Sequence, residues 1–171
     1  MKRVLASFLL ILPLVAAEVG KPLPRLQLSG KEGGRVDGSP FDSKRLHGKV
    51  TVIFYVDPDK KSLNEPFTEA LKAKRFDRSR YRSVAVVNMA ATWLPDFAIA
   101  AALKSKQKKY PDTLYVRDRR KKGVRVWGVA DDEANFLLVS KDGRVLYAAS
   151  GKIAESEWSE IFSLIERAMR E

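Results

Sequence analysis

The chain has 171 residues, of which 45% are hydrophobic and 31% are charged, so its length and composition suit one globular domain with a real core. It contains one histidine and no cysteine. The lack of cysteine excludes disulfides and thiol chemistry. A single histidine, His47, argues against a zinc site and leaves a serine triad without its usual general base.

Residues 1–17, MKRVLASFLLILPLVAA, have the pattern of a secretory signal peptide. Lys2 and Arg3 precede an apolar run of about a dozen residues, and small residues then precede Glu18. The alternative, a membrane anchor, is disfavoured because the run is too short to span a hydrocarbon core of about 30 Å. We therefore expect cleavage near Ala17, a periplasmic location, and one mature domain over residues 18–171.

Charge narrows the classes of partner. Without residues 1–17 the chain keeps 30 basic and 21 acidic residues, a net charge of +9. This balance favours acidic partners, including an anionic membrane surface. The basic run in residues 117–125 and the lysines in residues 104–109 are the candidates for such binding, although charged turns also protect sheet edges. Export, and the lack of a recognisable RNA- or DNA-binding motif, argue against nucleic acid.

The first half of the domain contains an arm, two strands and one helix. Residues 18–48 predict an irregular arm with a short edge hairpin near residues 26–28. Residues 50–56, VTVIFYV, predict a central strand that is buried on both faces. A helix follows, capped by Asn64, with Pro66 in its first turn. Residues 83–88 predict a second buried strand.

The second half begins with a predicted helix that starts at Pro95 and ends at Pro111. It carries Phe97, Ala101 and Ala102. Lysines in its last turns suit the negative end of the helix dipole. Residues 113–116 predict a third strand, and residues 118–129 fit either a short hairpin or a turn of helix.

A β-hairpin and an amphipathic helix close the chain. Residues 136–139 and 145–149 predict antiparallel strands joined by a tight turn. One face of the last helix carries Trp158, Ile161, Phe162, Ile165, Ala168 and Met169. The order β-α-β-α-β, then a hairpin and a helix, predicts an α/β fold with a mixed sheet and helices on both faces.

Several segments resemble the YtfJ family of exported bacterial proteins, which have a thioredoxin-like fold and no known function. They are HGKVTVIFYV, YRSVAVVN, KKYPDTLYVRD, the Trp127 region and LLVSKDGRVLYAASG. The arm KPLPRLQLSGKEG is similar to the first segment of the peroxiredoxin and TlpA-type branch. The resemblance implies a thioredoxin-like three-layer α/β/α sandwich.

The chain departs from the redox members of that superfamily at two places. Their cysteine pair would fall in the turn from Asp57 to Lys61, which has none. Their cis-proline would stand at about Ala134, where the sequence DDEANF has no proline. The resemblance therefore implies no redox activity, no catalytic residue and no cofactor.

The resemblance also implies a candidate binding site. In the fold that it implies, two loops that carry five acidic residues face each other. They are Asp57, Asp59, Asp131, Asp132 and Glu133. These carboxylates could dock a basic protein partner, bind a divalent cation, or simply be solvated. A cation such as calcium takes six to eight oxygen ligands. Trp93 lies in a loop near this face and is included as a candidate, although we expect Trp93 and Trp127 to be half-buried packing residues.

The leading hypothesis is a non-catalytic, exported domain that binds an unidentified envelope protein through these acidic loops. The alternative is a divalent-cation-binding protein that uses the same loops, although no set of metal ligands is assigned.

Overall fold

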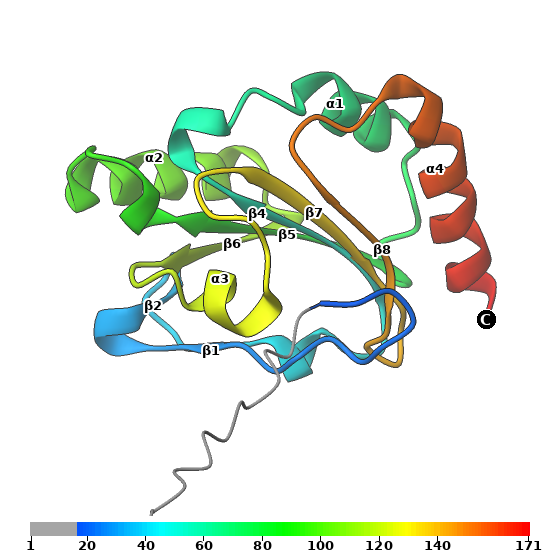
Figure 1. Ribbon diagram of the computed structural model, residues 1–171, viewed down its shortest axis with the longest axis horizontal. Coiled ribbons are helices and arrows are strands. Elements are labelled where there is room, and N and C mark those ends of the chain that lie inside the picture. The colour runs from blue at the N-terminus through cyan, green and yellow to red at the C-terminus, as the bar shows by residue number, and fades with distance from the viewer. Residues whose placement is uncertain (1–16) are drawn as a thin grey trace, which may run out of the picture.

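The computed structural model describes residues 17–171 (Figure 1). The predicted signal peptide, apart from Ala17, therefore lies outside the described residues. Within that range, no helix combines the length and the apolar character needed to cross a membrane.

A six-stranded mixed sheet forms the centre of the domain, in the order β2-β6-β5-β4-β7-β8. Its strands are β2 (Gly33–Arg35), β4 (Val50–Val56), β5 (Tyr81–Asn88), β6 (Thr113–Asp118), β7 (Ala134–Val139) and β8 (Val145–Ser150). Strands β4, β5 and β6 are parallel, whereas β7 runs antiparallel to β4, with Phe54 opposite Phe136. The predicted mixed sheet is confirmed, and its two most apolar strands are neighbours.

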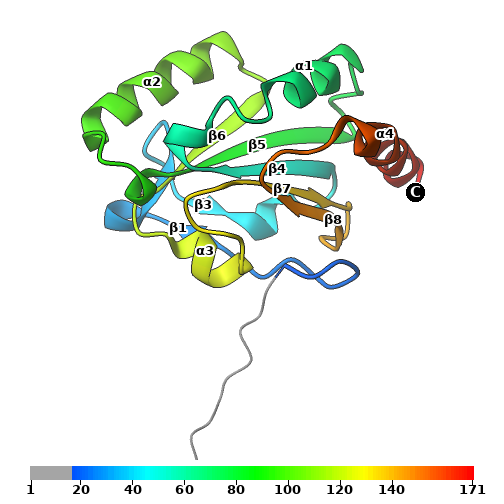
Figure 2. The ribbon, with the colours of Figure 1, turned by 45° about the horizontal axis from the view of Figure 1, so that its top comes forward.

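Helices and the arm cover the two faces of this sheet (Figures 1 and 2). One face carries α1 (Glu65–Ala73), α2 (Asp96–Lys109) and α4 (Glu155–Arg170). The other face carries the short α3 (Lys122–Trp127) and the arm, in which β1 (Gln27–Leu28) pairs with β3 (Phe41–Asp42). Residues 118–129, which fitted a hairpin or a helix, thus end β6 and form α3.

Strand β4 supplies both halves of the core because its side chains alternate between the two faces. Val52 packs in the cluster with Phe67 of α1 and with the apolar face of α4, as the sequence predicts. Ile53 and Tyr55 pack on the opposite side with Leu26, Leu28 and Trp127.

Trp127 corrects the expectation of a half-buried residue. Its side chain is fully buried, its ring meets Tyr55 edge-on at 6.2 Å, and its Nε1–H donates to the Pro24 carbonyl at 2.9 Å. It is buried because the arm closes over α3.

The arm also extends the sheet, which the sequence does not predict. Strand β2 pairs antiparallel with β6, and a Cβ on Gly33 would lie 1.9 Å from the Arg117 carbonyl oxygen. Only glycine permits this approach of two backbones. The glycine-rich stretch of residues 30–34 therefore serves strand pairing.

Asn64 stands at the N-cap of α1, as predicted, but its side chain does not cap that helix. Its Nδ2 donates to the Gly151 carbonyl at 2.9 Å, and its Oδ1 accepts the Ile153 amide at 2.9 Å. Asn64 therefore ties the start of α1 to the segment between β8 and α4.

Helix α2 buries different side chains from those that the sequence suggests. Ile99 and Leu103 are buried, whereas Phe97 is 77% exposed and Ala101 and Ala102 are exposed. The helix therefore contacts the sheet by a narrow stripe that includes Ile99 and Leu103.

Two phenylalanines in helices test this assignment of the core. Phe67→Ala should lower the free energy of unfolding by about 3–5 kcal/mol, because the ring is buried among Phe136, Trp158 and Phe162. Phe97→Ala, the control, should change it by less than about 0.5 kcal/mol. Equal losses in urea unfolding would contradict the packing described.

Candidate functional site

The two acidic loops meet at the edge where β4 ends and β7 begins. The Asp57 amide donates to the Glu133 carbonyl at 3.1 Å, and Val56 pairs with Ala134 in the sheet. We call the surface formed by residues 57–61, 119–121 and 130–133 the loop edge. The predicted convergence of these loops is therefore present.

Asp57 has a structural position within the loop edge. It is 4% exposed, and its carboxylate accepts the Asp59 amide at 2.8 Å, which caps a 3-10 turn over Pro58–Lys60. Asp59 itself is exposed. The turn in which the redox members would carry their cysteine pair is thus shaped here by a carboxylate at its first residue.

Asp131 and Asp132 are paired with a lysine that the sequence analysis assigned to a separate basic run. Lys121 Nζ lies 2.7 Å from Asp131 Oδ2 and 3.4 Å from Asp132 Oδ1. Burial raises the pKa of Asp131, but hydrogen bonds from Lys121, the Asp132 amide and Asn88 outweigh it, so the pKa is lowered from its ordinary value. Glu133 lies 4.0 Å from Lys60.

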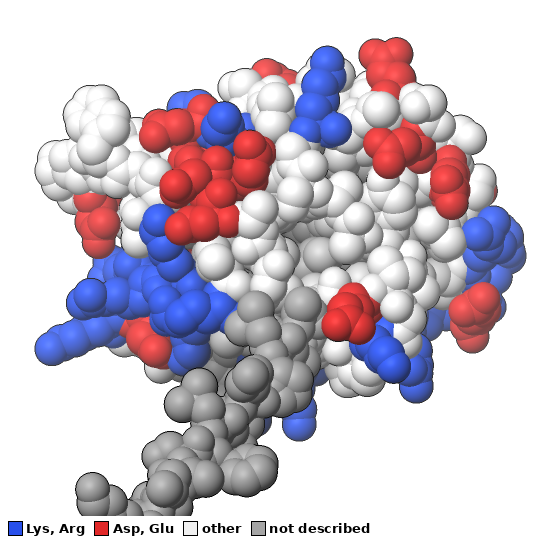
Figure 3. All heavy atoms as spheres, viewed as in Figure 1, with Lys and Arg blue, Asp and Glu red and all other residues white. Residues whose placement is uncertain are grey.

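These pairs leave the loop edge less acidic than the sequence suggests. Figure 3 shows a patch of acidic side chains beside a patch of basic ones on this face. Over residues 17–171, no three His, Cys, Asp or Glu side chains are grouped so that they could hold a metal ion. The divalent-cation alternative therefore has no defined site in this part of the chain.

Backbone conformation is unusual at the loop edge. Lys121 and Asp132, which form an ion pair, have φ values of 51° and 53°. Non-glycine residues rarely adopt this left-handed region, and strained residues of this kind gather at functional sites. Arg75, just after α1, is the third such residue within the described range.

Trp93 is 86% exposed, which corrects the expectation that it is half-buried. It follows a 3-10 turn at Met89–Ala91, where the chain leaves β5. The last residue of β5, Asn88, donates from Nδ2 to Asp131 at 3.0 Å, so this connection starts at the loop edge. Met89 and Leu94, in the same connection, pack in or against the cluster that contains Ile99, whereas the Trp93 side chain lies outside it.

Buried polar residues beneath the loop edge were missed by the sequence analysis. The Asp118 carboxylate accepts the Tyr55 hydroxyl at 3.0 Å and the Gly123 amide at 2.7 Å. Burial, with the nearby Asp118 charge, raises the pKa of Tyr55. Asn135 accepts the Ala130 amide at 3.0 Å and donates to the Tyr55 carbonyl at 3.2 Å. Asp118 at the end of an apolar strand was the one available signal.

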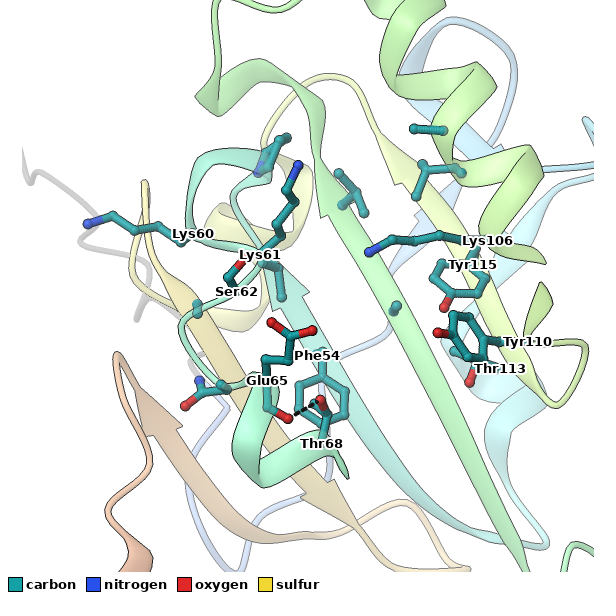
Figure 4. A pocket seen from close by; sticks show the side chains of 18 of the residues that line it. Phe54, Lys60, Lys61, Ser62, Glu65, Thr68, Lys106, Tyr110, Thr113 and Tyr115 are labelled. Atoms are coloured by element: carbon teal, nitrogen blue, oxygen red, sulfur yellow. Dashed lines mark hydrogen bonds between the residues drawn. The ribbon is translucent and has the colours of Figure 1, made fainter. Parts of the chain in front are cut away.

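An apolar groove begins beside the loop edge and runs between α1 and α2 (Figure 4). Pro58, Lys60 and Ala134 line the end of it that belongs to the loop edge, and Leu94 links it to the segment with Trp93. Nothing in the sequence pattern indicated this groove, because it depends on the spacing of two helices over the sheet.

Solved structures with the same fold are redox proteins by name. A thiol peroxidase from Chromobacterium violaceum superposes with a TM-score of 0.64 at 10% identity, covering 90% of this chain and 88% of that one. A thiol-disulfide isomerase from Corynebacterium glutamicum gives 0.58 at 18% identity, covering 87% and 97%. The fold is therefore thioredoxin-like, here in a chain without cysteine.

Residues 27–168 match the model of the family described as "Bacterial protein of unknown function (YtfJ_HI0045)". The chain belongs to this YtfJ family. It is 24% identical over 183 aligned positions to the uncharacterized protein YtfJ of Escherichia coli strain K12, with 99% of both chains covered. The family and fold inferred from the resemblance are confirmed.

The pairing of Lys121 with Asp131 can be tested by titration. In Lys121→Met the pKa of Asp131 should rise, because burial then acts with less opposition. In the wild type, the lowered pKa stabilises the fold above pH about 4, and this contribution is lost as the pH falls through the folded-state pKa. The variant should therefore lose less stability on acidification.

Carboxyl-carbon NMR titration and urea unfolding at neutral and acidic pH provide the two measurements. Lys104→Met, at an exposed position of α2, is the matched control and should leave Asp131 unchanged. An unaltered Asp131 titration in Lys121→Met would show that the pair does not form in solution.

Proposed function

We propose that this protein is a non-catalytic, exported protein-binding module of the bacterial cell envelope, and that its partner docks on the loop edge and Trp93. The exposure of Trp93 is the observation that carries the proposal. Tryptophan is enriched among the residues that dominate binding energy at protein interfaces, where its ring fills a pocket of the partner.

The chemistry of the loop edge supports a partner with basic residues around an apolar recess. Asp59 is exposed, and the Asp132 side chain is 65% exposed, so both can accept new ion pairs. Lys60 is paired with Glu133, and Lys121 is paired with Asp131 and, at 3.4 Å, with Asp132. A basic partner side chain would thus compete with an internal lysine for the acidic groups, which favours specificity over raw affinity.

A non-catalytic role is supported by chemistry at the former redox position. Asp57 is a buried cap of the turn from Asp57 to Lys61, and a chain without cysteine has no thiol to oxidise. The left-handed Lys121 and Asp132 support a binding role at the same place, because a strained backbone persists only where its surroundings fix it.

Site-specific photo-crosslinking in cells of the source bacterium tests the proposal. A crosslinking amino acid at position 93, 59 or 132 should give one shared protein adduct, and the same amino acid at Lys108, on an exposed part of α2, should not. Adducts that are the same at all four positions, or none at the loop edge, would reject this surface.

With the crosslinked partner purified, Trp93→Ala should weaken binding by about 30-fold or more, as expected for a residue worth about 2 kcal/mol. Phe97→Ala, which removes another exposed ring four residues further along the chain, is the matched control and should have a smaller effect. Both variants should unfold at the same urea concentration as the wild type, since neither ring is buried.

Export is tested separately. The full chain expressed in a Gram-negative host should be recovered from the periplasmic fraction with an N-terminus near Glu18. The double variant Leu9→Arg, Leu10→Arg should stay in the cytoplasm, because charges interrupt the apolar region that a signal peptide needs. Full-length protein in the cytoplasm of the wild-type strain would contradict the signal peptide.

A further inference from the structure

The groove between α1 and α2 exposes the middle of the sheet. Phe54 and Val56 of β4, with Ala85 and Val87 of β5, point into it and are only half-buried. Central strands covered by helices are normally buried on both faces. Here the two helices leave a cavity of about 520 Å³ above those four side chains.

Small side chains explain why the cavity is open. Ala98 and Ala102 of α2 and Thr68 of α1 are among the residues that line it, and these short side chains leave space between the two helices. The volume falls within the range of about 300–1,000 Å³ that is usual for small-molecule sites. An apolar surface left open at such a place marks a binding groove more often than a packing fault.

Positive charge surrounds this apolar floor. Four lysines and two glutamates line the groove. Two of the lysines are paired: Lys72 with Glu69, which also lines the groove, and Lys60 with Glu133 outside it. Among residues 17–171, Lys61 and Lys106 have no carboxylate within ion-pair distance. Figure 4 shows Lys106 reaching from α2 across the groove toward the side that carries Lys61.

Both walls are fixed by side-chain bridges. Gln107 of α2 donates to the Thr113 carbonyl at 2.8 Å and accepts the Tyr115 amide at 3.1 Å, which ties the helix to β6. Asn64 ties the start of α1 to the segment after β8. The groove is therefore preformed, and a ligand would bind without ordering the chain around it.

We propose that this groove binds one single-chain fatty carboxylate, with its hydrocarbon chain on Phe54, Val56 and Ala85 and its carboxylate between Lys61 and Lys106. An apolar floor with unpaired cations on opposite sides matches an amphipathic anion, whose tail gains from burial and whose head gains a charge-assisted hydrogen bond. The site shares Lys61 with the loop edge, but Trp93 is not among the residues that line it.

Calorimetric titration of the mature domain with decanoate, below the concentration at which it forms micelles, tests the proposal. One molecule should bind per chain with a saturable heat. Decanol lacks the charge and acetate lacks the chain, so each should bind at least about tenfold more weakly than decanoate.

Variants on one helix separate the groove from nonspecific binding. Ala102→Phe should fill the cavity and reduce decanoate affinity by about tenfold or more, whereas Ala101→Phe, outside the groove, should not. Lys61→Gln with Lys106→Gln should produce a similar loss, and Lys104→Gln with Lys108→Gln should not.

Three results would overturn the proposal: no saturable binding of decanoate, equal binding to Ala102→Phe and Ala101→Phe, or equal binding of decanol and decanoate. Association of two chains that Ala102→Phe abolishes would assign the groove to self-assembly instead. Circular dichroism of every variant should match the wild type. Crosslinking at position 93 is independent of this titration, so failure of either proposal leaves the other measurable.

Discussion

The position of β4 determines the rest of the structure. It lies between parallel β5 and antiparallel β7, is hydrogen-bonded along both sides, and sends alternate side chains into two cores. Because β4 and β5 end at the same edge of the sheet and β7 begins there, the loops that follow and precede them must meet. The contact between Asp57 and Glu133, and the start of the segment that carries Trp93, are consequences of this arrangement.

Elements with a continuous apolar signal were predictable from the sequence. Five of the six strands of the central sheet carry β-branched apolar runs, and α4 shows a clear helical period. The order of these elements along the chain was therefore enough to predict a mixed sheet. Strand β2 could not be found, because Gly33 and Gly34 have no side chains to form a pattern. Residues 118–129 stayed ambiguous, because α3 is only six residues long and its burial comes from the arm.

The site was predictable in its location and less so in its chemistry. The resemblance in fold predicted that the acidic residues lie close together. It did not predict their ion-pair partners Lys60 and Lys121, because these lysines lie in turns whose direction depends on tertiary structure. Trp93 and Trp127 show the same limit, because one residue type is exposed or buried according to what covers it. The groove was beyond prediction, since it exists where two helices fail to touch.

Asn64 has one more consequence for the molecule. A single amide side chain joins the start of α1 to the backbone on either side of Lys152, so α1 and α4 are connected there by hydrogen bonds as well as by the packing of Phe67 against Phe162. Any force that pulls α1 outward is therefore shared with the carboxyl-terminal helix.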